Sequence, residues 1–211
     1  GPEVFLKAIF ETSLKEQLGL ITVVASKKVI KNVSQKLNYH KTDSLKIIEV
    51  NLDSDVILGK PDKKNAPYVI ECLNKAVDLA HKEKIPLVTG PINKKVVTNT
   101  ISGFSGHTEF LKEKFGCEDV LMLLANNSLK VGVATTHIAL KDVPKMISKD
   151  LIIRKCKLLD KGLKDIYGLV APKIAVLGLN PHAGEDGSFG IEEIESINPA
   201  IAHLKKEDFD I

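Results

Sequence analysis

The sequence predicts an α/β protein built as a layered α/β/α architecture around a mostly parallel sheet. Short aliphatic and β-branched runs, which are typical of strands, alternate with amphipathic stretches of helical spacing along the chain. The strand-like runs are Leu20–Ala25, Lys46–Val50, Ile85–Val88, Val120–Leu124, Lys130–Ala134 and Lys173–Leu177. Several of them are apolar enough to be buried on both faces. Strands that alternate with helices indicate a parallel sheet covered by helices.

Helical periodicity is clearest in two long stretches. In Pro67–Lys84, apolar residues recur three or four positions apart, at Ile70, Leu73, Val77 and Ala80. The same spacing lies between Asp150 and Tyr167, at Ile152, Cys156, Leu159, Leu163 and Ile166. Gly168 follows where a helix stop is expected. A further helix is expected to begin at Pro2, because proline suits the first helical turn.

Composition excludes several classes of protein. The 211 residues carry 30 basic and 27 acidic side chains, and this small excess is spread thinly. Aromatic residues make up 5% and tryptophan is absent, so a nucleic-acid partner is not expected. No apolar run reaches the roughly 18 residues of a membrane span. We expect a cytoplasmic protein in which residues 1–211 form one incomplete α/β domain, with room for two lobes and a cleft.

The three cysteines, Cys72, Cys117 and Cys156, are far apart in the sequence and contain no CxxC pair. They indicate neither a disulfide framework nor a thiolate zinc site. We expect each to be a small buried apolar residue in a reducing compartment.

Polar segments follow the predicted strands, and in parallel α/β sheets ligands bind at the carboxyl ends of strands. The first such segment is Thr89-Gly90-Pro91-Ile92-Asn93-Lys94. Asn93 and Lys94 lie at a predicted helix start, where free amides and the helix dipole favour an anion. A plain turn with a solvated lysine also explains this segment, and both interpretations stay open.

A second segment, Gly106–Leu111, opens a predicted helix that ends near Gly116. Thr108 is a suitable N-cap residue for this helix. His107 directly before it lies where a ligand would meet the helix N-terminus, so we interpret His107 as a functional residue.

Two histidines follow strand-like runs. Lys130–Ala134 leads to His137, and Lys173–Leu177 leads into Gly178–Glu185, which contains His182. If the two strands are parallel neighbours, both imidazoles emerge at one edge of the sheet. Neutral imidazoles on stiff elements are good ligands for divalent metals. For either histidine alone, a structural role is the better interpretation. The two together support the hypothesis of a metal site. We give His40, His81 and His203 no role.

Several catalytic motifs are missing. The chain has no GxGxxG after a strand and no Walker loop. It also has no GxSxG elbow and no HExxH helix. A Rossmann dehydrogenase, a P-loop kinase, a serine hydrolase and a zincin are therefore disfavoured. The residues alone indicate an α/β enzyme with a histidine metal site, and they do not identify a reaction.

The polar segments resemble, in order, the motifs of the 4-hydroxythreonine-4-phosphate dehydrogenase family. They are Thr-Gly-Pro-Ile-Asn-Lys at 89–94, Gly-His-Thr-Glu-Phe-Leu at 106–111, Ala-Thr-Thr-His at 134–137 and Leu-Asn-Pro-His-Ala-Gly-Glu at 179–185. Gly1-Pro2-Glu3 is similar to the tail of the family's N-terminal motif. Each motif alone is weak, but five in the right order are highly specific, and the resemblance covers nearly the whole chain.

The resemblance implies the fold of isocitrate- and isopropylmalate-type dehydrogenases, which hold NAD or NADP without a Rossmann fingerprint. It implies that His107 and Thr108 contact substrate, and that His137 and His182 are two of three histidines that bind a divalent metal. The metal is zinc, or cobalt, magnesium, manganese or nickel. We assign Asn93 and Lys94 as candidate catalytic residues, and no cofactor-binding residue is identified. A homodimer with its site at the subunit interface is also implied.

The implied reaction is oxidation of 4-phosphooxy-L-threonine, a small phosphorylated hydroxy amino acid. Hydride passes from the secondary alcohol to the nicotinamide, and the β-keto acid then loses carbon dioxide. The product is 3-amino-2-oxopropyl phosphate, in the biosynthesis of pyridoxine and pyridoxal phosphate. A metal held by neutral imidazoles keeps its charge and lowers the pKa of the alcohol, and the cofactor carries the hydride.

The sequence departs from the family pattern at both ends. It begins inside the N-terminal motif and stops before the Tyr-His-Asp segment, which brings the third metal histidine, and before the phosphate-binding residues. An incomplete ligand set leaves an ion mostly to water. We therefore expect the 211-residue chain alone to bind metal weakly and to have little or no dehydrogenase activity.

Other functions stay open beside this one. A related dehydrogenase of the phosphothreonate type fits the same motifs. A metal-dependent hydrolase or lyase is a second class, with Glu185 or Asp186 as its carboxylate base. A third is a non-catalytic dimerising or binding module. The sequence does not distinguish NAD from NADP, and it does not identify the metal.

Overall fold

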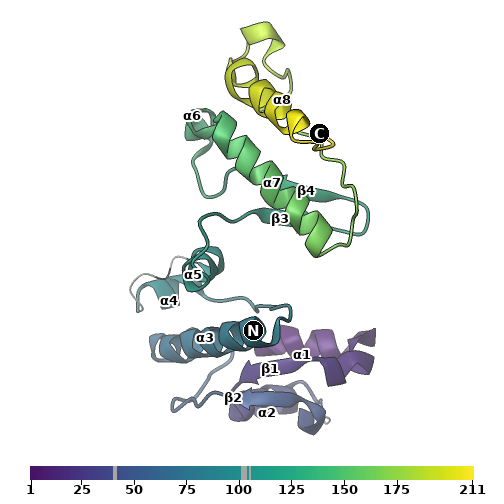
Figure 1. Ribbon diagram of the computed structural model, residues 1–211. Helices are drawn as coiled ribbons and strands as arrows, with labels where there is room; N and C mark the ends of the chain where they lie inside the picture. The colour runs from purple at the N-terminus through teal and green to yellow at the C-terminus, as the bar shows by residue number, and fades with distance from the viewer. Residues whose placement is uncertain (40–41, 101–103, 105) are drawn as a thin grey trace. The chain divides into compact units, whose positions relative to one another are not determined.

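The chain folds into two compact units, Gly1–Gly116 and Cys117–Ile211. A computed structural model describes residues 1–39, 42–100, 104 and 106–211 (Figure 1). His40, to which we gave no role, lies outside these described residues. Each unit has its own elements and its own apolar core.

Unit 1 combines helices with a parallel pair of strands. Its α-helices and strands are α1 (Pro2–Phe10), β1 (Thr22–Ala25), α2 (Lys27–Lys36), β2 (Lys46–Glu49), α3 (Ala66–Glu83), α4 (Lys94–Thr98) and α5 (His107–Lys114). Short 3-10 helices are η1 (Ser13–Leu20), η2 (Thr42–Ser44) and η3 (Lys63–Asn65). β1 pairs with β2 in parallel, with Thr22 opposite Lys46 and Ala25 opposite Glu49. The crossover between them is α2, as a parallel pair requires.

Unit 2 combines an antiparallel strand pair with helices. Its α-helices and strands are β3 (Met122–Ala125), β4 (Lys130–Val133), α6 (Val143–Met146), α7 (Lys149–Asp165) and α8 (Asn198–Lys206). Its 3-10 helices are η4 (Leu140–Asp142) and η5 (Glu185–Gly187), and a π-helix, η6 (Glu193–Ile197), runs directly into α8. Helix α7 lies alongside β3 and β4 (Figure 1), and a Cβ placed on Gly132 of β4 would lie 3.5 Å from Cδ2 of Leu159.

The cores follow the helical spacing read from the sequence. In unit 1 one cluster joins α1, β1 and α2, and its buried members are Leu6, Ala25, Val29, Ile30, Val33 and Leu45. A second joins α3, α4 and Phe104, with Ala66, Leu73, Val77 and Val97. The core of unit 2 lies between α7 and the η6–α8 segment, and its buried members are Ile152, Cys156, Ile197, Ala200 and Leu204.

The predicted α/β class is confirmed, and so are the helices. The stretch Pro67–Lys84 forms α3, and Asp150–Tyr167 forms most of α7. Gly168 has φ +68 and its N–H donates to the carbonyl of Lys164 at 3.1 Å, so it is the glycine stop expected after α7. Pro2 stands in the first turn of α1.

One strand pair, around residue 125, departs from the mostly parallel arrangement expected from the sequence. β3 and β4 are antiparallel, with Met122 opposite Val133. Only four residues, 126–129, connect them, and a parallel pair needs a crossover of about a dozen residues. The Asn126 side chain closes this turn, because its Oδ1 accepts from the N–H groups of Ser128 and Leu129 at 2.9 and 2.7 Å.

Two predicted strands, Ile85–Val88 and Lys173–Leu177, form no strand in the described part of the chain. A strand needs a backbone partner on at least one side. Val88 is 93% exposed, whereas Ile174 is buried and its N–H donates to the carbonyl of Asp210 at 2.9 Å. The apolar pattern is present, but the ladder that would define each strand is not.

Burial of the cysteines agrees with the prediction at one position. Cys156 is buried, Cys72 is half-buried and Cys117 is exposed, so the expectation of a buried residue was wrong for Cys117. Across the described residues, every helix is too short or too polar to cross a lipid bilayer.

Candidate functional site

The turn between β1 and α2 is occupied by the protein's own groups. In a Rossmann fold this turn, at the start of the first helix, receives the dinucleotide phosphates. Here the Glu49 carboxylate accepts from the N–H of Lys27 at 3.1 Å. The Tyr68 hydroxyl accepts from the N–H of Ser26 at 2.8 Å. Both amides are therefore satisfied internally, in agreement with the missing glycine fingerprint.

The segment after residue 88 forms a helix start, as predicted. Asn93 is the N-cap of α4, and its Oδ1 accepts from the N–H of Val96 at 3.1 Å. Lys94 is the first residue of α4, and its side chain is exposed. The capping bond explains the asparagine structurally. It leaves the Lys94 amine as the group of this segment that is available to an anion.

The start of the chain lies beside this segment. A Cβ placed on Gly90 would lie 3.6 Å from the Cα of Gly1. Two of the motif segments, which are about ninety positions apart in the sequence, are therefore neighbours within unit 1.

Helix α5 begins two residues earlier than predicted. Its N-cap is Gly106, so the assignment of Thr108 as N-cap was wrong, and His107 and Thr108 are the first two helical residues. A Cβ on Gly106 would lie 2.9 Å from Oε2 of Glu109 and 3.6 Å from Nζ of Lys94. Because a side chain would collide with this carboxylate, the close approach of Glu109 favours a glycine. Lys94 and His107, which are predicted site residues, thus meet at one helix start.

His107 is held neutral by its surroundings. Its ring is half-buried, and its Nε2 has no hydrogen-bond partner in the described part of the chain. Burial, and then the nearby Lys94 cation, lower the pKa of His107 below its usual range. The ring meets Phe104 edge-on, at 6.3 Å between centroids. A buried nitrogen without a partner has a free-energy cost, and none of the described residues offsets it here.

His137 lies four residues beyond the end of β4 and is exposed. Its φ of +57 is left-handed, a conformation in which histidine is enriched over most residues. The imidazole of His137 is therefore exposed after the exit from β4, and its role as a metal ligand stays a prediction.

His182 is exposed and oriented on two sides. Its Nδ1 lies 2.6 Å from Oε1 of Glu185. Its ring stacks on that of Phe189, with centroids 4.7 Å apart and planes 17° apart. A neutral histidine that donates through Nδ1 to a carboxylate has its Nε2 lone pair open to a metal. Glu185 and Phe189 therefore hold the His182 ring in its observed orientation.

The loop that carries His182 has an unusual backbone. Five successive residues, 183–187, have positive φ, and three of them are not glycine: Ala183 (φ +48), Glu185 (φ +39) and Asp186 (φ +54). Such residues cost roughly 1–2 kcal/mol each in the left-handed region. Strain of this kind persists only where surrounding contacts enforce it, and it clusters at functional sites.

Two residues that enforce this loop were missed by the sequence reasoning. The Asn180 side chain accepts from the N–H of His182 at 2.9 Å and donates to the carbonyl of Phe189 at 2.8 Å. Glu193 is 7% exposed, and its Oε1 accepts from the N–H of Leu179 at 2.8 Å. Spacing carried a signal for Glu193, because residues 193, 197, 200 and 204 share one helical face and the last three are buried core residues.

The predicted site residues fall into two sets, one in each unit. Asn93, Lys94, His107 and Thr108 belong to unit 1, and His137 and His182 belong to unit 2. The imidazole chemistry of the second set fits a divalent metal. Within the described ranges, no three histidine, cysteine, aspartate or glutamate side chains gather as a metal centre. The assignment of His137 and His182 to one metal stays a prediction.

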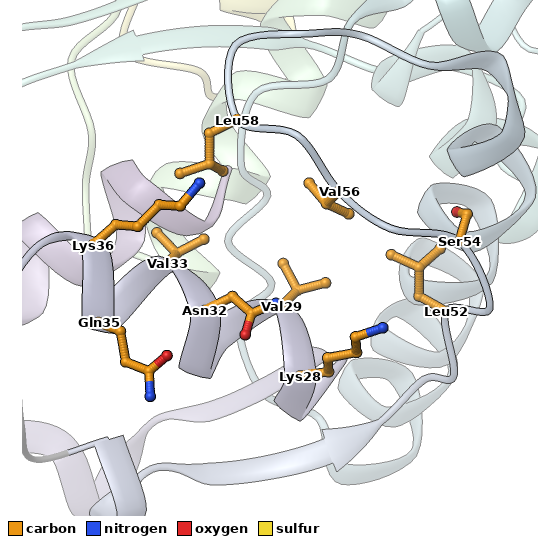
Figure 2. Close-up of a pocket in the computed structure, with 10 residues that line it drawn as sticks. All are labelled: Lys28, Val29, Asn32, Val33, Gln35, Lys36, Leu52, Ser54, Val56 and Leu58. Atoms are coloured by element: carbon orange, nitrogen blue, oxygen red, sulfur yellow. The ribbon is translucent and has the colours of Figure 1, made fainter.

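A separate hollow lies in unit 1 between α2 and residues 52–58 (Figure 2). Its volume is about 330 Å³, and it is lined by Lys28, Val29, Asn32, Val33, Gln35, Lys36, Leu52, Ser54, Val56 and Leu58. None of these is a predicted site residue. Its floor consists of core residues Val29 and Val33, and we assign it no ligand.

The architecture defines an α/β protein with an isocitrate/isopropylmalate dehydrogenase-like fold. The solved structure of a 4-hydroxythreonine-4-phosphate dehydrogenase from Klebsiella pneumoniae superposes with a TM-score of 0.88 at 26% identity, over 99% of this chain and 68% of that one. A second such enzyme, from Burkholderia phymatum, gives a TM-score of 0.84 at 27% identity, over 99% and 68%. Residues 7–211 match the family model described as pyridoxal phosphate biosynthetic protein PdxA. The chain belongs to the PdxA family.

Curated relatives agree with this assignment. The 4-hydroxythreonine-4-phosphate dehydrogenase of Yersinia enterocolitica is 43% identical over 169 residues, which are 80% of this chain and 51% of that protein. The enzyme of the same name from Colwellia psychrerythraea is 35% identical over 207 residues, covering 90% of this chain and 64% of the relative. The chain thus spans about half the length of the first of these relatives and about two thirds of the second.

Proposed function

We propose that the protein containing this chain is a 4-hydroxythreonine-4-phosphate dehydrogenase. It oxidises and decarboxylates 4-phosphooxy-L-threonine with NAD or NADP to give 3-amino-2-oxopropyl phosphate. The observation that carries the metal-dependent part is the contact of 2.6 Å between Nδ1 of His182 and Glu185. This contact supports the proposal, because a carboxylate that holds one ring nitrogen of a histidine commonly orients the other toward a metal. Family membership supports the reaction and the phosphorylated substrate.

In unit 1 the start of α5 is suited to hold an anionic substrate. The first amides of a helix have no internal partner and carry the positive end of the helix dipole. The Lys94 amine lies beside Gly106 at this start. The neutral His107 ring and the exposed Thr108 hydroxyl add hydrogen-bonding groups that carry no charge. Carboxylate or phosphate oxygens of the substrate would bind to these groups.

In unit 2, His137 and His182 would bind the divalent metal through neutral imidazole nitrogens. When bound, such an ion supplies Lewis acidity, which lowers the pKa of a substrate hydroxyl. Glu185 fixes the tautomer of His182, and Phe189 holds its ring plane. Zinc, cobalt, nickel, manganese and magnesium all remain candidates. We further propose a cytoplasmic homodimer with the site at its interface, as the family resemblance implies.

The hydrolase alternative would need Glu185 or Asp186 as a general base. Glu185 is already engaged with the His182 ring. This contact supports an orienting role for Glu185 and weighs against its use as a base.

The test uses the full-length protein that contains this chain. Nicotinamide reduction is followed by absorbance after 4-phosphooxy-L-threonine and a divalent metal are added. We expect reduced cofactor to accumulate with wild type, and His137→Ala and His182→Ala each to abolish it without lowering the unfolding temperature. A chelator should abolish the activity, and zinc or cobalt should restore it. Release of inorganic phosphate without cofactor reduction would instead establish the hydrolase. Full activity in both histidine variants would refute the metal assignment.

A further inference from the structure

The loop around His182 depends on a carboxylate that has no counterpart among the site residues assigned so far. Glu193 lies in the π-helix η6, is 7% exposed and faces the loop rather than solvent. Its Oε1 accepts from the N–H of Leu179 at 2.8 Å. π-Helical turns are rare and occur frequently at functional sites. The Glu193 carboxylate thus holds Leu179, near the start of the loop, from the buried side.

The second oxygen of Glu193 faces Gly184, on the other arm of the loop. Oε2 is buried, and no hydrogen-bond partner for it lies in the described residues. A Cβ on Gly184 would lie 2.8 Å from this oxygen and 3.0 Å from the carbonyl oxygen of Gly190. Gly184 also has φ +79, a backbone conformation that favours glycine. Both this φ and the nearby carboxylate therefore favour glycine at this position. Along the chain, His182 lies between Leu179, which donates to Glu193, and Gly184, which the second carboxylate oxygen faces.

We propose that Glu193 is a positioning residue, which acts through His182 by clamping both arms of the loop that presents this imidazole. The inference rests on the proposed role of His182 as a metal ligand. Asn180 completes the clamp, because its side chain holds the N–H of His182 and the carbonyl of Phe189, the residue whose ring stacks on the imidazole. Glu193 itself touches neither metal nor substrate.

The first test measures the clamp without any metal. The Leu179 amide donates to Glu193, so hydrogen exchange at this amide should accelerate at least tenfold in Glu193→Leu, a factor that corresponds to about 1.4 kcal/mol of lost protection. Glu193→Gln retains an acceptor oxygen and should keep the amide protected. Glu195→Ala changes an exposed acid of the same π-helix and is the matched control. Unchanged exchange at Leu179 in Glu193→Leu would overturn the proposal.

The second test titrates Co²⁺ into metal-free protein by calorimetry. We expect Glu193→Leu to weaken Co²⁺ binding roughly 10- to 100-fold, as the loss of residues that orient a metal ligand does. Glu193→Gln and Glu195→Ala should stay close to wild type. In a His182→Ala background, Glu193→Leu should have little further effect, because the residue acts through that imidazole. If Glu193→Leu fails to fold, Glu193→Asp, which withdraws the carboxylate by one methylene, replaces it with the same expectation.

The outcomes separate the two proposals. If His182→Ala weakens Co²⁺ binding but Glu193→Leu does not, the positioning role is wrong and the metal ligand stands. If Glu193→Leu weakens binding equally with and without His182, its effect is a general structural one and the positioning role is again wrong. If His182→Ala leaves Co²⁺ affinity unchanged, the metal assignment itself fails.

Discussion

At the scale of single residues, the charge of a histidine depends on its neighbours. His107 stands at the start of α5, half-buried and beside the Lys94 amine. Burial first, and the cation second, disfavour the protonated ring and lower its pKa. The ring is therefore a neutral hydrogen-bonding group where a ligand meets the helix, and it has a measurable pH signature.

The lowered pKa of His107 predicts how stability responds to pH. Below about pH 6.5 the unfolded chain protonates this histidine, whereas the folded protein resists protonation. Its contribution to the free energy of unfolding is therefore complete above that pH and is lost as pH falls toward the folded pKa. Urea unfolding at several pH values should show a flatter profile for His107→Gln. An unchanged profile would count against the buried, neutral ring.

The second cause of the shift can be tested separately. Lys94→Gln removes the cation but leaves the burial of the ring, so the pKa of His107 should rise part of the way toward its usual range. Titration of the His107 ring protons by NMR measures this directly. A pKa that does not change in Lys94→Gln would mean that the amine lies too far away to act on the ring.

Site residues could be read from the sequence where chemistry and chain position coincide. His107 opens α5 and His137 follows β4, as the pattern indicated, whereas the run before His182 forms no strand. Glu193 was missed because it acts through a long-range contact, to Leu179 fourteen residues earlier. A charged residue in the buried phase of a helix is the signal that could have found it.

At the scale of elements, the loop 178–190 combines side-chain clamps with a left-handed backbone. Gly184 is a constrained position of this loop, with φ +79 and no space for a methyl group. Gly162 is the opposite case, since it lies inside α7 and a Cβ there would meet nothing within 4 Å. The two glycines form a matched pair.

Substitution by alanine should therefore act in opposite directions at these two glycines. Gly184→Ala should lower the free energy of unfolding by about 1–3 kcal/mol, because it adds strain and a collision with Glu193. Gly162→Ala should raise it by roughly 0.5–1 kcal/mol, since alanine favours the helix interior. Chemical denaturation of both variants measures the difference. Equal effects of the two substitutions would contradict the loop geometry.

Helices were predicted more accurately than strands because their signal is local. The predicted Pro67–Lys84 and observed α3 differ by one residue at each end. Strand pairing depends on partners that the local pattern does not specify. The runs Ile85–Val88 and Lys173–Leu177 are apolar, but neither forms a ladder in the part of the chain that the structure describes. For β3 and β4, the four-residue turn between them determines the antiparallel pairing.

At the scale of the whole molecule, the chain has two compact units with separate cores. Leu6 belongs to the core of unit 1 and Leu204 to that of unit 2, and both side chains are fully buried. The sequence established neither the division into two units nor the boundary between them. No linker-like composition marks Gly116, where the first unit ends. The expectation of a single domain with room for two lobes stays a prediction.

The separate cores predict separate responses to core mutations. Leu204→Ala should destabilise unit 2 by about 2–5 kcal/mol, and Leu6→Ala should do the same to unit 1. Hydrogen exchange should show lost amide protection mainly in residues 117–211 for the first variant and mainly in 1–116 for the second. Loss of protection throughout the chain in either variant would mean that the units unfold together.

The stacked rings of His182 and Phe189 also provide a built-in spectroscopic probe. The centroids lie 4.7 Å apart and the planes are nearly parallel. Circulating π electrons of the phenyl group shield nuclei above its face, so the carbon-bound imidazole protons should resonate upfield of those in a random-coil histidine. Arrival of an ion, or a displaced phenyl group, would change that resonance without any attached label. The aromatic neighbour thus lets the protein report on the occupancy of its own loop.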